Sequence, residues 1–125
     1  KKKAVSDLSL FENNIEETNG INTIVMTVEN YDLNILKEII SVLSNKIKNS
    51  FIFIANINNN SVNYVAKATN DLQDKINCGE IVKNASQKSN GSGGGSKVFA
   101  QGGGTSTDKI EEIVEEVKSI VKNIN

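Results

Sequence analysis

Seven of the nine glycines lie between residues 91 and 104, where two glycine clusters flank the segment Ser96 to Gln101. Glycine backbones can approach a ligand closely, and their free N–H groups can bind a phosphate with little regard to sequence. A flexible Gly/Ser linker would not need the apolar Val98 and Phe99 in its middle. We therefore predict that 91–104 is an ordered glycine-rich loop that binds another molecule through its backbone.

Lysine side chains surround this segment and could contact a polyanion. Over the span 67–97 five lysines face three acidic residues, which are Lys67, Lys75, Lys83, Lys88 and Lys97 against Asp71, Asp74 and Glu80. The excess is small, so a functional basic patch and a random scatter of lysines are equally compatible with it. Lys97 is the best placed because it lies within the loop. If three lysines contact phosphates, the affinity should fall with salt at a log–log slope of about −2 to −3.

The composition disfavours catalysis by this chain alone. The sequence contains no histidine, the residue most often used for acid–base catalysis near neutral pH and required in most nucleophilic triads. The segment 91–98 superficially matches the phosphate loop of nucleotide triphosphatases, but Ser96 and Val98 replace its second glycine and its hydroxyl residue. The glutamates of the last predicted helix lie opposite its apolar stripe, which indicates a solvated face. We expect no catalytic residue and no metal site here.

Composition also bounds the cellular setting. The single cysteine, Cys78, excludes an internal disulfide and a thiolate-rich zinc site, and a reducing cytoplasm fits best. Apolar runs such as 52–57 are too short to span a bilayer, and no secretory segment opens the chain, so no membrane partner is expected. The net charge of −1 gives no global attraction to nucleic acid. Because the chain begins with lysines and not methionine, it is expected to be a fragment of a longer protein.

Periodicity predicts the elements in order. Apolar residues at three- and four-residue spacing predict an N-terminal helix over about 4–17, a helix from Asp32 to about Lys48, a short helix over 78–88 and a final helix. Asp32 can cap the second of these, and Thr105, Ser106 or Thr107 can cap the last. Segments rich in β-branched residues predict strands at 21–28, 51–57 and 62–68, with a turn at 58–60. The glycine-rich segment is expected to contain a short extended piece at Lys97 to Gln101.

These elements predict an α/β domain with a small sheet of three to four mixed strands packed with helices. The first two strands flank a helix and should be parallel neighbours, and the third should form a hairpin with the second. Residues 1–19 are interpreted as the end of a helical connector or dimerisation segment. Residues 20–125 form the globular domain, which contains the glycine-rich loop 91–104.

Several of these segments carry a family resemblance. The runs Ile76–Val82, Gly93–Gly95 and Phe99–Gly103, together with the opening Asn19–Ile21, are similar to the C-terminal, DHH-associated domain of alanyl-tRNA synthetase. The resemblance covers residues 5–123, and Ala-Gln between two glycine clusters is its most specific part. One departure is Ser96-Lys97-Val98, where the family commonly carries Arg-Pro-Asp.

The resemblance implies a domain that binds the outer corner of alanine-accepting tRNA, cooperates in aminoacylation and editing, and adjoins a helical segment able to support a homodimer. Aminoacylation with ATP and magnesium and zinc-dependent editing would reside in other domains, so no cofactor is expected in this chain. The residues that the resemblance and the charge pattern nominate for RNA binding are Lys83, Lys88, Gly93, Gly94, Gly95, Lys97, Gln101, Gly102 and Gly103.

Two alternatives remain open at this point. The chain could be chiefly a dimerisation module, with Phe11 and Ile15 of the N-terminal helix as interface anchors. It could also be the substrate-binding domain of a DHH-type phosphodiesterase. Ser96 stands where the glycine signature of those enzymes has histidine, and no Asp-His-His segment is present, so the phosphodiesterase is disfavoured.

Overall fold

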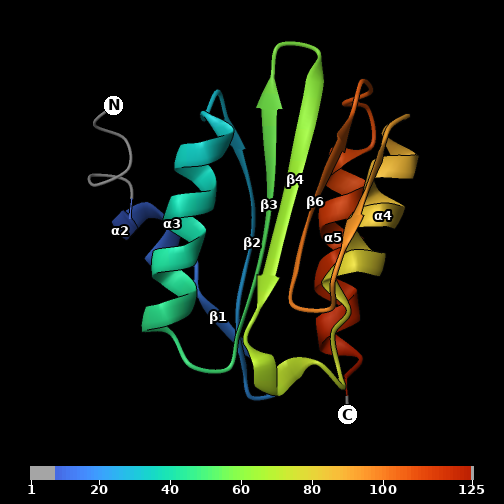
Figure 1. Cartoon of the computed structure of the whole chain (residues 1–125). Helices are drawn as coiled ribbons and strands as arrows, with labels where there is room; N and C mark the ends of the chain where they lie inside the picture. Colours follow the sequence, from blue (N-terminus) through green and yellow to red (C-terminus); the bar gives the residue numbers. More distant parts are fainter. Residues whose placement is uncertain (1–7, 125) are drawn as a thin grey trace.

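The computed structural model describes residues 8–124, so the predicted helix start at 4–7 lies outside the described part. A six-stranded sheet runs through the molecule with helices on both faces (Figure 1). The elements are α2 (Leu8–Glu12), β1 (Glu16–Thr18), β2 (Ile21–Glu29), α3 (Leu33–Lys46), β3 (Ser50–Asn58), β4 (Ser61–Ala68), the 3-10 turn η1 (Asn70–Leu72), α4 (Cys78–Lys88), β5 (Ser92–Gly95), β6 (Phe99–Gly104) and α5 (Ile110–Lys122).

The strand order is β1-β2-β3-β4-β6-β5, and only β2 and β3 among the paired neighbours run parallel. The predicted α/β class, the parallel pair around α3 and the β3–β4 hairpin are confirmed. The sheet is larger than the three to four strands predicted. The additional strands come from the N-terminal segment and from the glycine-rich segment, neither of which has the apolar alternation that marks a strand.

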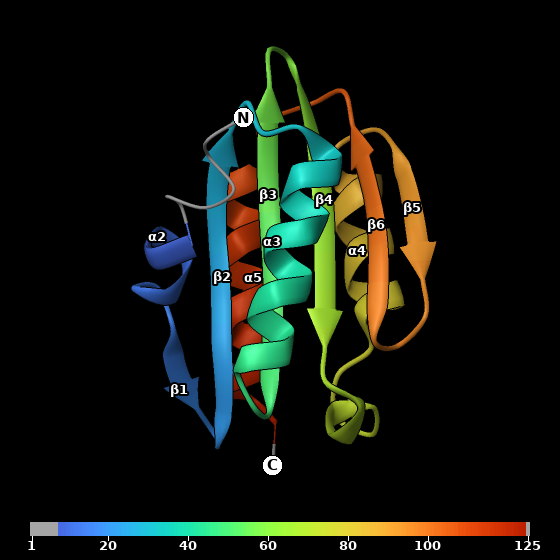
Figure 2. The same cartoon turned by 60° about the vertical axis from the view of Figure 1, so that its left-hand side comes forward.

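Each face of the sheet has its own core. α2 and α3 cover one face, and α4 and α5 cover the other (Figure 1, Figure 2). Side chains of β3 alternate between them, with Phe51 and Phe53 in the α4/α5 core and Ile52 and Ile54 in the α3 core. Because both faces are covered, β3 is apolar at successive positions, as expected of a central strand.

α3 forms as its sequence predicts. The Asp32 carboxylate accepts hydrogen bonds from the backbone N–H groups of Asn34 at 2.8 Å and Ile35 at 3.3 Å, which confirms the predicted cap. The helix ends at Lys46, two residues earlier than predicted. Its apolar stripe is buried against the sheet, as predicted for Leu36, Ile39, Ile40 and Leu43.

The predicted N-terminal helix is wrong in its second half. The described helix ends at Glu12, and residues 16–18 form β1, an antiparallel strand on the edge of β2. Phe11 is fully buried and packs edge-on against the Tyr31 ring, with 6.0 Å between centroids. Phe11 therefore belongs to the core of this domain and is not available as the interface anchor that the dimerisation alternative requires.

α5 also differs at its start. It begins at Ile110, and no side chain of the preceding segment caps it, so the predicted cap by Thr105, Ser106 or Thr107 is wrong. The Ser106 N–H instead donates to the Ser89 carbonyl at 2.9 Å, which ties this segment to the end of α4. None of the helices within residues 8–124 has the length and apolar character needed to cross a membrane.

Candidate nucleic-acid interface

The glycine-rich segment is a β-hairpin and not a loop, and the extended piece predicted at 97–101 overlaps one of its strands, β6. β5 pairs with β6 from Ser92↔Gly103 to Gly95↔Ala100, and β6 also pairs with β4. The turn between the strands is fixed by Ser96, whose N–H donates to the Phe99 carbonyl at 2.8 Å. A loop would leave its backbone N–H groups free for a ligand, whereas here many of them form hydrogen bonds within the sheet. β6 is paired on both sides, with β4 and with β5.

The N-terminus of α4 is occupied by this turn. The N–H groups of Cys78 and Gly79 donate to the carbonyls of Lys97 and Ser96 at 3.0 and 2.8 Å. The next N–H, of Glu80, donates to the Asn77 side chain at 3.2 Å. The first N–H groups of a helix are the ones that would bind an anion. Because Lys97, Ser96 and Asn77 accept from these three N–H groups, none of the three is free for a phosphate.

One face of the hairpin lies directly against α4. A Cβ added at Gly102 would lie 2.4 Å from the Ser86 hydroxyl oxygen, and one at Gly93 would lie 2.7 Å from it. A Cβ at Gly79 of the helix would lie 2.6 Å from the Gly95 carbonyl oxygen. Side chains at these positions would push the helix away from the sheet. These glycines are therefore explained by close helix packing.

Burial raises the pKa of two side chains packed around α4, the Tyr64 hydroxyl and the Cys78 thiol. The Tyr64 and Ser89 hydroxyls share a hydrogen bond of 2.6 Å, and burial raises the pKa of Tyr64. Burial also raises the pKa of the Cys78 thiol to about 12. A thiol that stays protonated is a poor nucleophile. Cys78 thus acts as a small apolar residue of the core.

The other face of the hairpin is open. We define the open hairpin face by Lys67, Gly94, Phe99, Gln101 and Gly103, which alternation and register place on the side of α3. α3 extends over β3 and β4 but not over β6 and β5 (Figure 2). Gln101 is exposed, no atom lies within 4 Å of a Cβ built on Gly94, and the Lys67 ammonium lies 5.7 Å from the centre of the half-buried Phe99 ring.

The structure separates the residues nominated from the sequence. Gly94, Gln101 and Gly103 share the open hairpin face, and the exposed Lys97 lies in the turn at its margin. Lys83 and Lys88 lie on α4, behind the hairpin, where the Lys88 ammonium contacts the Glu116 carboxylate at 2.5 Å. Of the remaining nominated glycines, Gly93 and Gly102 face Ser86 of α4, and Gly95 lies against Phe99 and Ala100 of β6.

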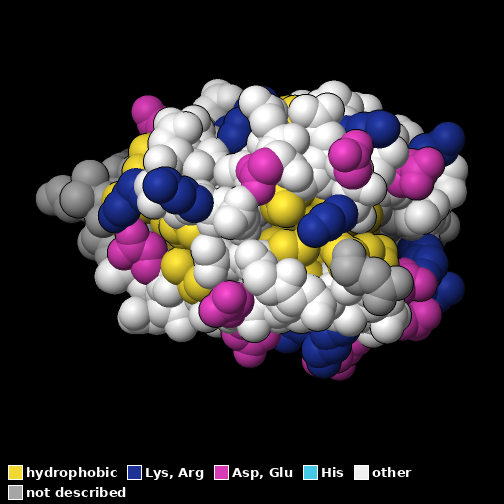
Figure 3. All heavy atoms as spheres, turned by 90° about the horizontal axis from the view of Figure 1, so that it is seen from below, with side chains coloured by type: hydrophobic (Ala, Val, Ile, Leu, Met, Phe, Trp, Pro, Cys, Tyr) yellow, Lys and Arg dark blue, Asp and Glu magenta, His cyan; other side chains and the backbone are white. Residues whose placement is uncertain are grey.

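Lys67 and Phe99 complete the open face, although sequence reasoning did not nominate them. Phe99 stood inside the motif that carried the family resemblance, and Lys67 was counted among the neighbouring lysines. The Lys67↔Phe99 pairing of β4 with β6 brings them together. Lysine and acidic side chains are interspersed over the end of the molecule viewed in Figure 3. A binding surface there would depend on particular side chains and not on a field of one sign.

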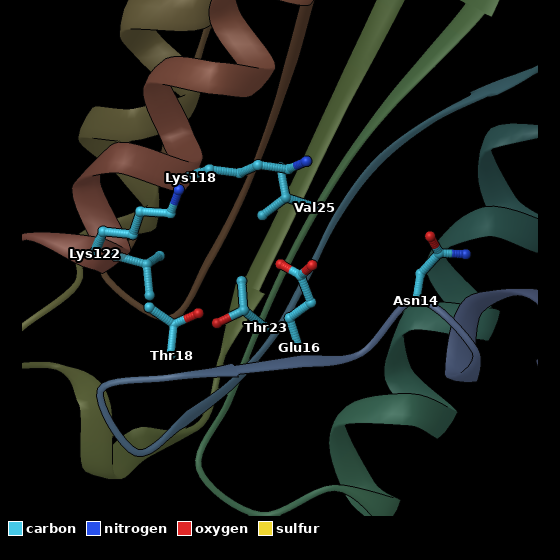
Figure 4. A pocket seen from close by; sticks show the side chains of 8 residues that line it. Asn14, Glu16, Thr18, Thr23, Val25, Lys118 and Lys122 are labelled. Atoms are coloured by element: carbon cyan, nitrogen blue, oxygen red, sulfur yellow. The ribbon is translucent and has the colours of Figure 1, made fainter.

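A separate hollow lies between β1, β2 and α5 (Figure 4). It has a volume of about 60 Å³, and Lys118 and Lys122 line it together with Glu16. Nearby, the Asn19 side chain donates to the carbonyls of Val121 at 2.8 Å and Lys122 at 2.9 Å, which ties the β1–β2 turn to the C-terminal end of α5. The hollow itself is small and its lining carries charges of both signs, so it is a poor fit for a polyanion.

A family model and the sequences of known proteins point to the same family. Residues 20–123 match the model of the DHHA1 domain. The alanine–tRNA ligase of Alkaliphilus oremlandii is 39% identical over 105 residues, which are 83% of this chain and 12% of the ligase. The chain therefore spans about an eighth of the length of that relative.

Solved structures agree with this assignment. The C-Ala domain of alanyl-tRNA synthetase from Aquifex aeolicus superposes with a TM-score of 0.77 at 26% identity, covering 87% of this chain and 98% of that domain. An exopolyphosphatase-related protein from Bacteroides fragilis has a TM-score of 0.64 at 14% identity, covering 98% of this chain and 35% of its own. At that identity the second likeness shows the fold alone, and it gives the phosphodiesterase alternative no support.

Proposed function

The chain belongs to the DHHA1 domain family, and from this premise we propose that it is the C-terminal tRNA-binding and assembly domain of an alanine–tRNA ligase. The observation that carries the proposal is the match to nearly the whole of a C-Ala domain. In this proposal the domain holds alanine-accepting tRNA but performs no chemistry itself. ATP, magnesium and zinc are handled by other domains of a cytoplasmic parent enzyme.

We assign tRNA contact to the open hairpin face and to Lys97 at its margin. An aromatic ring with a lysine over it suits RNA, because bases stack on aromatic side chains while ammonium groups pair with phosphates. The glycine at 94 leaves room for a backbone or ribose to approach closely. The open face is therefore the part of the hairpin that combines access, an aromatic surface and positive charge.

Lys83 provides the matched control for this assignment. It is exposed on α4, on the opposite side of the hairpin from the open face, and it carries the same charge as Lys97. Lys88 is less suited as a control because its ammonium is engaged by Glu116. Reversing the charge of either Lys83 or Lys97 would weaken long-range attraction to RNA equally. A direct phosphate contact would be lost only when the charge of Lys97 is reversed.

Fluorescence anisotropy with an alanine-accepting tRNA tests the proposal. We expect Lys97→Glu to lower the affinity roughly tenfold and to make the salt slope shallower by about 1, while Lys83→Glu changes the affinity much less. In the parent enzyme, Lys97→Glu should slow transfer of alanine to tRNA and leave tRNA-independent alanine activation unchanged. Absence of tRNA binding at low salt, or equal effects of the two variants, would refute the assignment.

Homodimerisation through the N-terminal segment is the less favoured function. Phe11 lies in the core, and Ile15, the other proposed anchor, is partly buried against that core. The exposed apolar residue of α2 that could serve such an interface is Leu10, which is 47% exposed. Sedimentation of Leu10→Ser distinguishes the two roles. We expect the variant to leave both the association state and tRNA binding unchanged.

A further inference from the structure

A polar hollow adjoins the open hairpin face at the end where β6 begins. It lies between the last turn of α3, the end of β4 and the β5–β6 turn, which gather at the same end of the sheet (Figure 2). Its volume is about 340 Å³, within the range of about 300–1,000 Å³ in which proteins bind small molecules. Its lining includes Ser44, Asn45, Lys67, Thr69, Asn70 and Val98.

The lining combines hydrogen-bonding amides with one positive charge. Asn45 and Asn70 are exposed, and each amide offers both donors and an acceptor. The hydroxyls of Ser44 and Thr69 are already engaged, with the Ser41 carbonyl at 3.1 Å and the Ser50 N–H at 3.2 Å. No carboxylate lines this hollow within the described part of the chain. The site thus suits a ligand with a polar, neutral ring and an adjacent negative charge.

Lys67 connects the hollow to the open hairpin face. Lys67 lines the hollow, and its ammonium lies 5.7 Å from the centre of the Phe99 ring. Val98, which directly precedes Phe99, supplies an apolar wall. A polynucleotide strand stacked on Phe99 would therefore bring its next phosphate to Lys67 and its next base to the mouth of the hollow.

From this arrangement we infer that the hollow receives one unstacked nucleotide of an RNA loop, with the phosphate at Lys67 and the base edge at Asn45 and Asn70. In the last turn of α3 the Leu43 carbonyl accepts from the Ile47 N–H at 2.9 Å. The final carbonyls of a helix, which follow it here, lack intrahelical partners and can accept from an exocyclic amino group of the base. This inference rests on the proposed tRNA-binding function and deepens it. The ligand class is an unpaired nucleotide, because a base held in a duplex cannot leave the stack without breaking its pair.

The test compares tRNA with a fully paired RNA duplex of similar length, using the 125-residue chain and fluorescence anisotropy. We expect the wild type to bind tRNA at least fivefold more tightly than the duplex. Asn45→Leu and Asn70→Leu should each weaken tRNA binding about fivefold, because the loss of one hydrogen bond to the base lowers the affinity by about that factor. Neither variant should change duplex binding. Asn84→Leu, an exposed asparagine on α4, is the matched control and should change neither.

The outcomes separate this inference from the proposed function. If tRNA and duplex bind equally, or if both asparagine variants bind tRNA like the wild type, the nucleotide pocket is refuted while tRNA binding stands. If neither RNA binds at low salt, both proposals fall together. Thermal melts of the variants establish that each is folded, and because both side chains are exposed we expect unchanged melting temperatures.

Discussion

The two faces of the β5–β6 hairpin use the same residue type for different purposes. On one face Gly93 and Gly102 admit α4 so closely that a Cβ at either position would collide with Ser86. On the other face Gly94 has nothing above it, and Gln101 and Phe99 remain accessible. The covered face determines stability, and the open face is the one we assign to RNA. Strand register decides which glycine serves which purpose.

The largest expected effect is on the covered face. Gly102→Val should destabilise the domain by about 3 kcal/mol or more, since overpacking costs about 1–3 kcal/mol and here meets both Ser86 and the Gly93 backbone. Gln101→Val, one residue away on the open face, should change stability by less than about 0.5 kcal/mol. Urea unfolding measures both. Equal destabilisation by the two variants would contradict the difference between the faces.

A double variant sharpens this prediction. The Ser86 hydroxyl is buried without a hydrogen-bond partner, so Ser86→Ala should cost little alone. Because that oxygen is the closest atom to a Cβ at residue 102, at 2.4 Å, Ser86→Ala should restore part of the stability lost in Gly102→Ala. Strictly additive changes would show that the contact is not the cause.

The second-largest effect is expected from alkaline pH, which should lower the free energy of unfolding through the buried groups on the α4 side of the sheet. The Cys78 pKa is raised by burial from about 9 to about 12 in the folded state, so the unfolded thiol ionises first. The contribution of this thiol to stability is complete below pH 9 and is lost as the pH rises through 12, with a slope of up to about 1.4 kcal/mol per pH unit. The raised pKa of Tyr64 acts in the same direction.

Urea unfolding of the wild type and Cys78→Ala over this pH range isolates the thiol. The variant should be less stable at neutral pH because packing is lost, but its stability should fall less steeply above pH 9, because no thiol remains to ionise. Parallel curves for the two proteins would mean that Cys78 is not buried as described.

A smaller effect is expected from the buried hydroxyl pair. Tyr64→Phe leaves the Ser89 hydroxyl without its partner at 2.6 Å and should cost about 1–2 kcal/mol in urea unfolding. The double variant Tyr64→Phe/Ser89→Ala should recover part of this loss. If Tyr64→Phe alone has no effect, the hydrogen bond does not hold α4 to the sheet.

The smallest effect on stability belongs to the open face. Gln101→Ala should change the free energy of unfolding by less than about 0.5 kcal/mol. It should nevertheless weaken tRNA binding several-fold, since one hydrogen bond contributes about 1 kcal/mol. Gln87→Ala, at an exposed position on α4, is the matched control and should leave the affinity unchanged. Equal affinities for all three proteins in anisotropy would contradict the assignment.

Local signals were predictable from the sequence, and pairings over long distances were not. The α3 stripe and its Asp32 cap act within a few residues, and both were predicted correctly. The hairpin was missed because glycines carry no side chains and so leave no alternation to read. For the same reason the sequence brought Lys97 and Gln101 into one candidate site but could not separate them from Lys83, whose position depends on which side of α4 faces the sheet.

A ¹⁵N–¹H spectrum of the chain titrated with alanine-accepting tRNA tests the central claim most directly. We expect the backbone signals of Gly94, Phe99 and Gln101 to shift or broaden on binding, while those of Lys83 and Gln87 on α4 stay in place. Changes confined to α4, or no change anywhere at low salt, would contradict it.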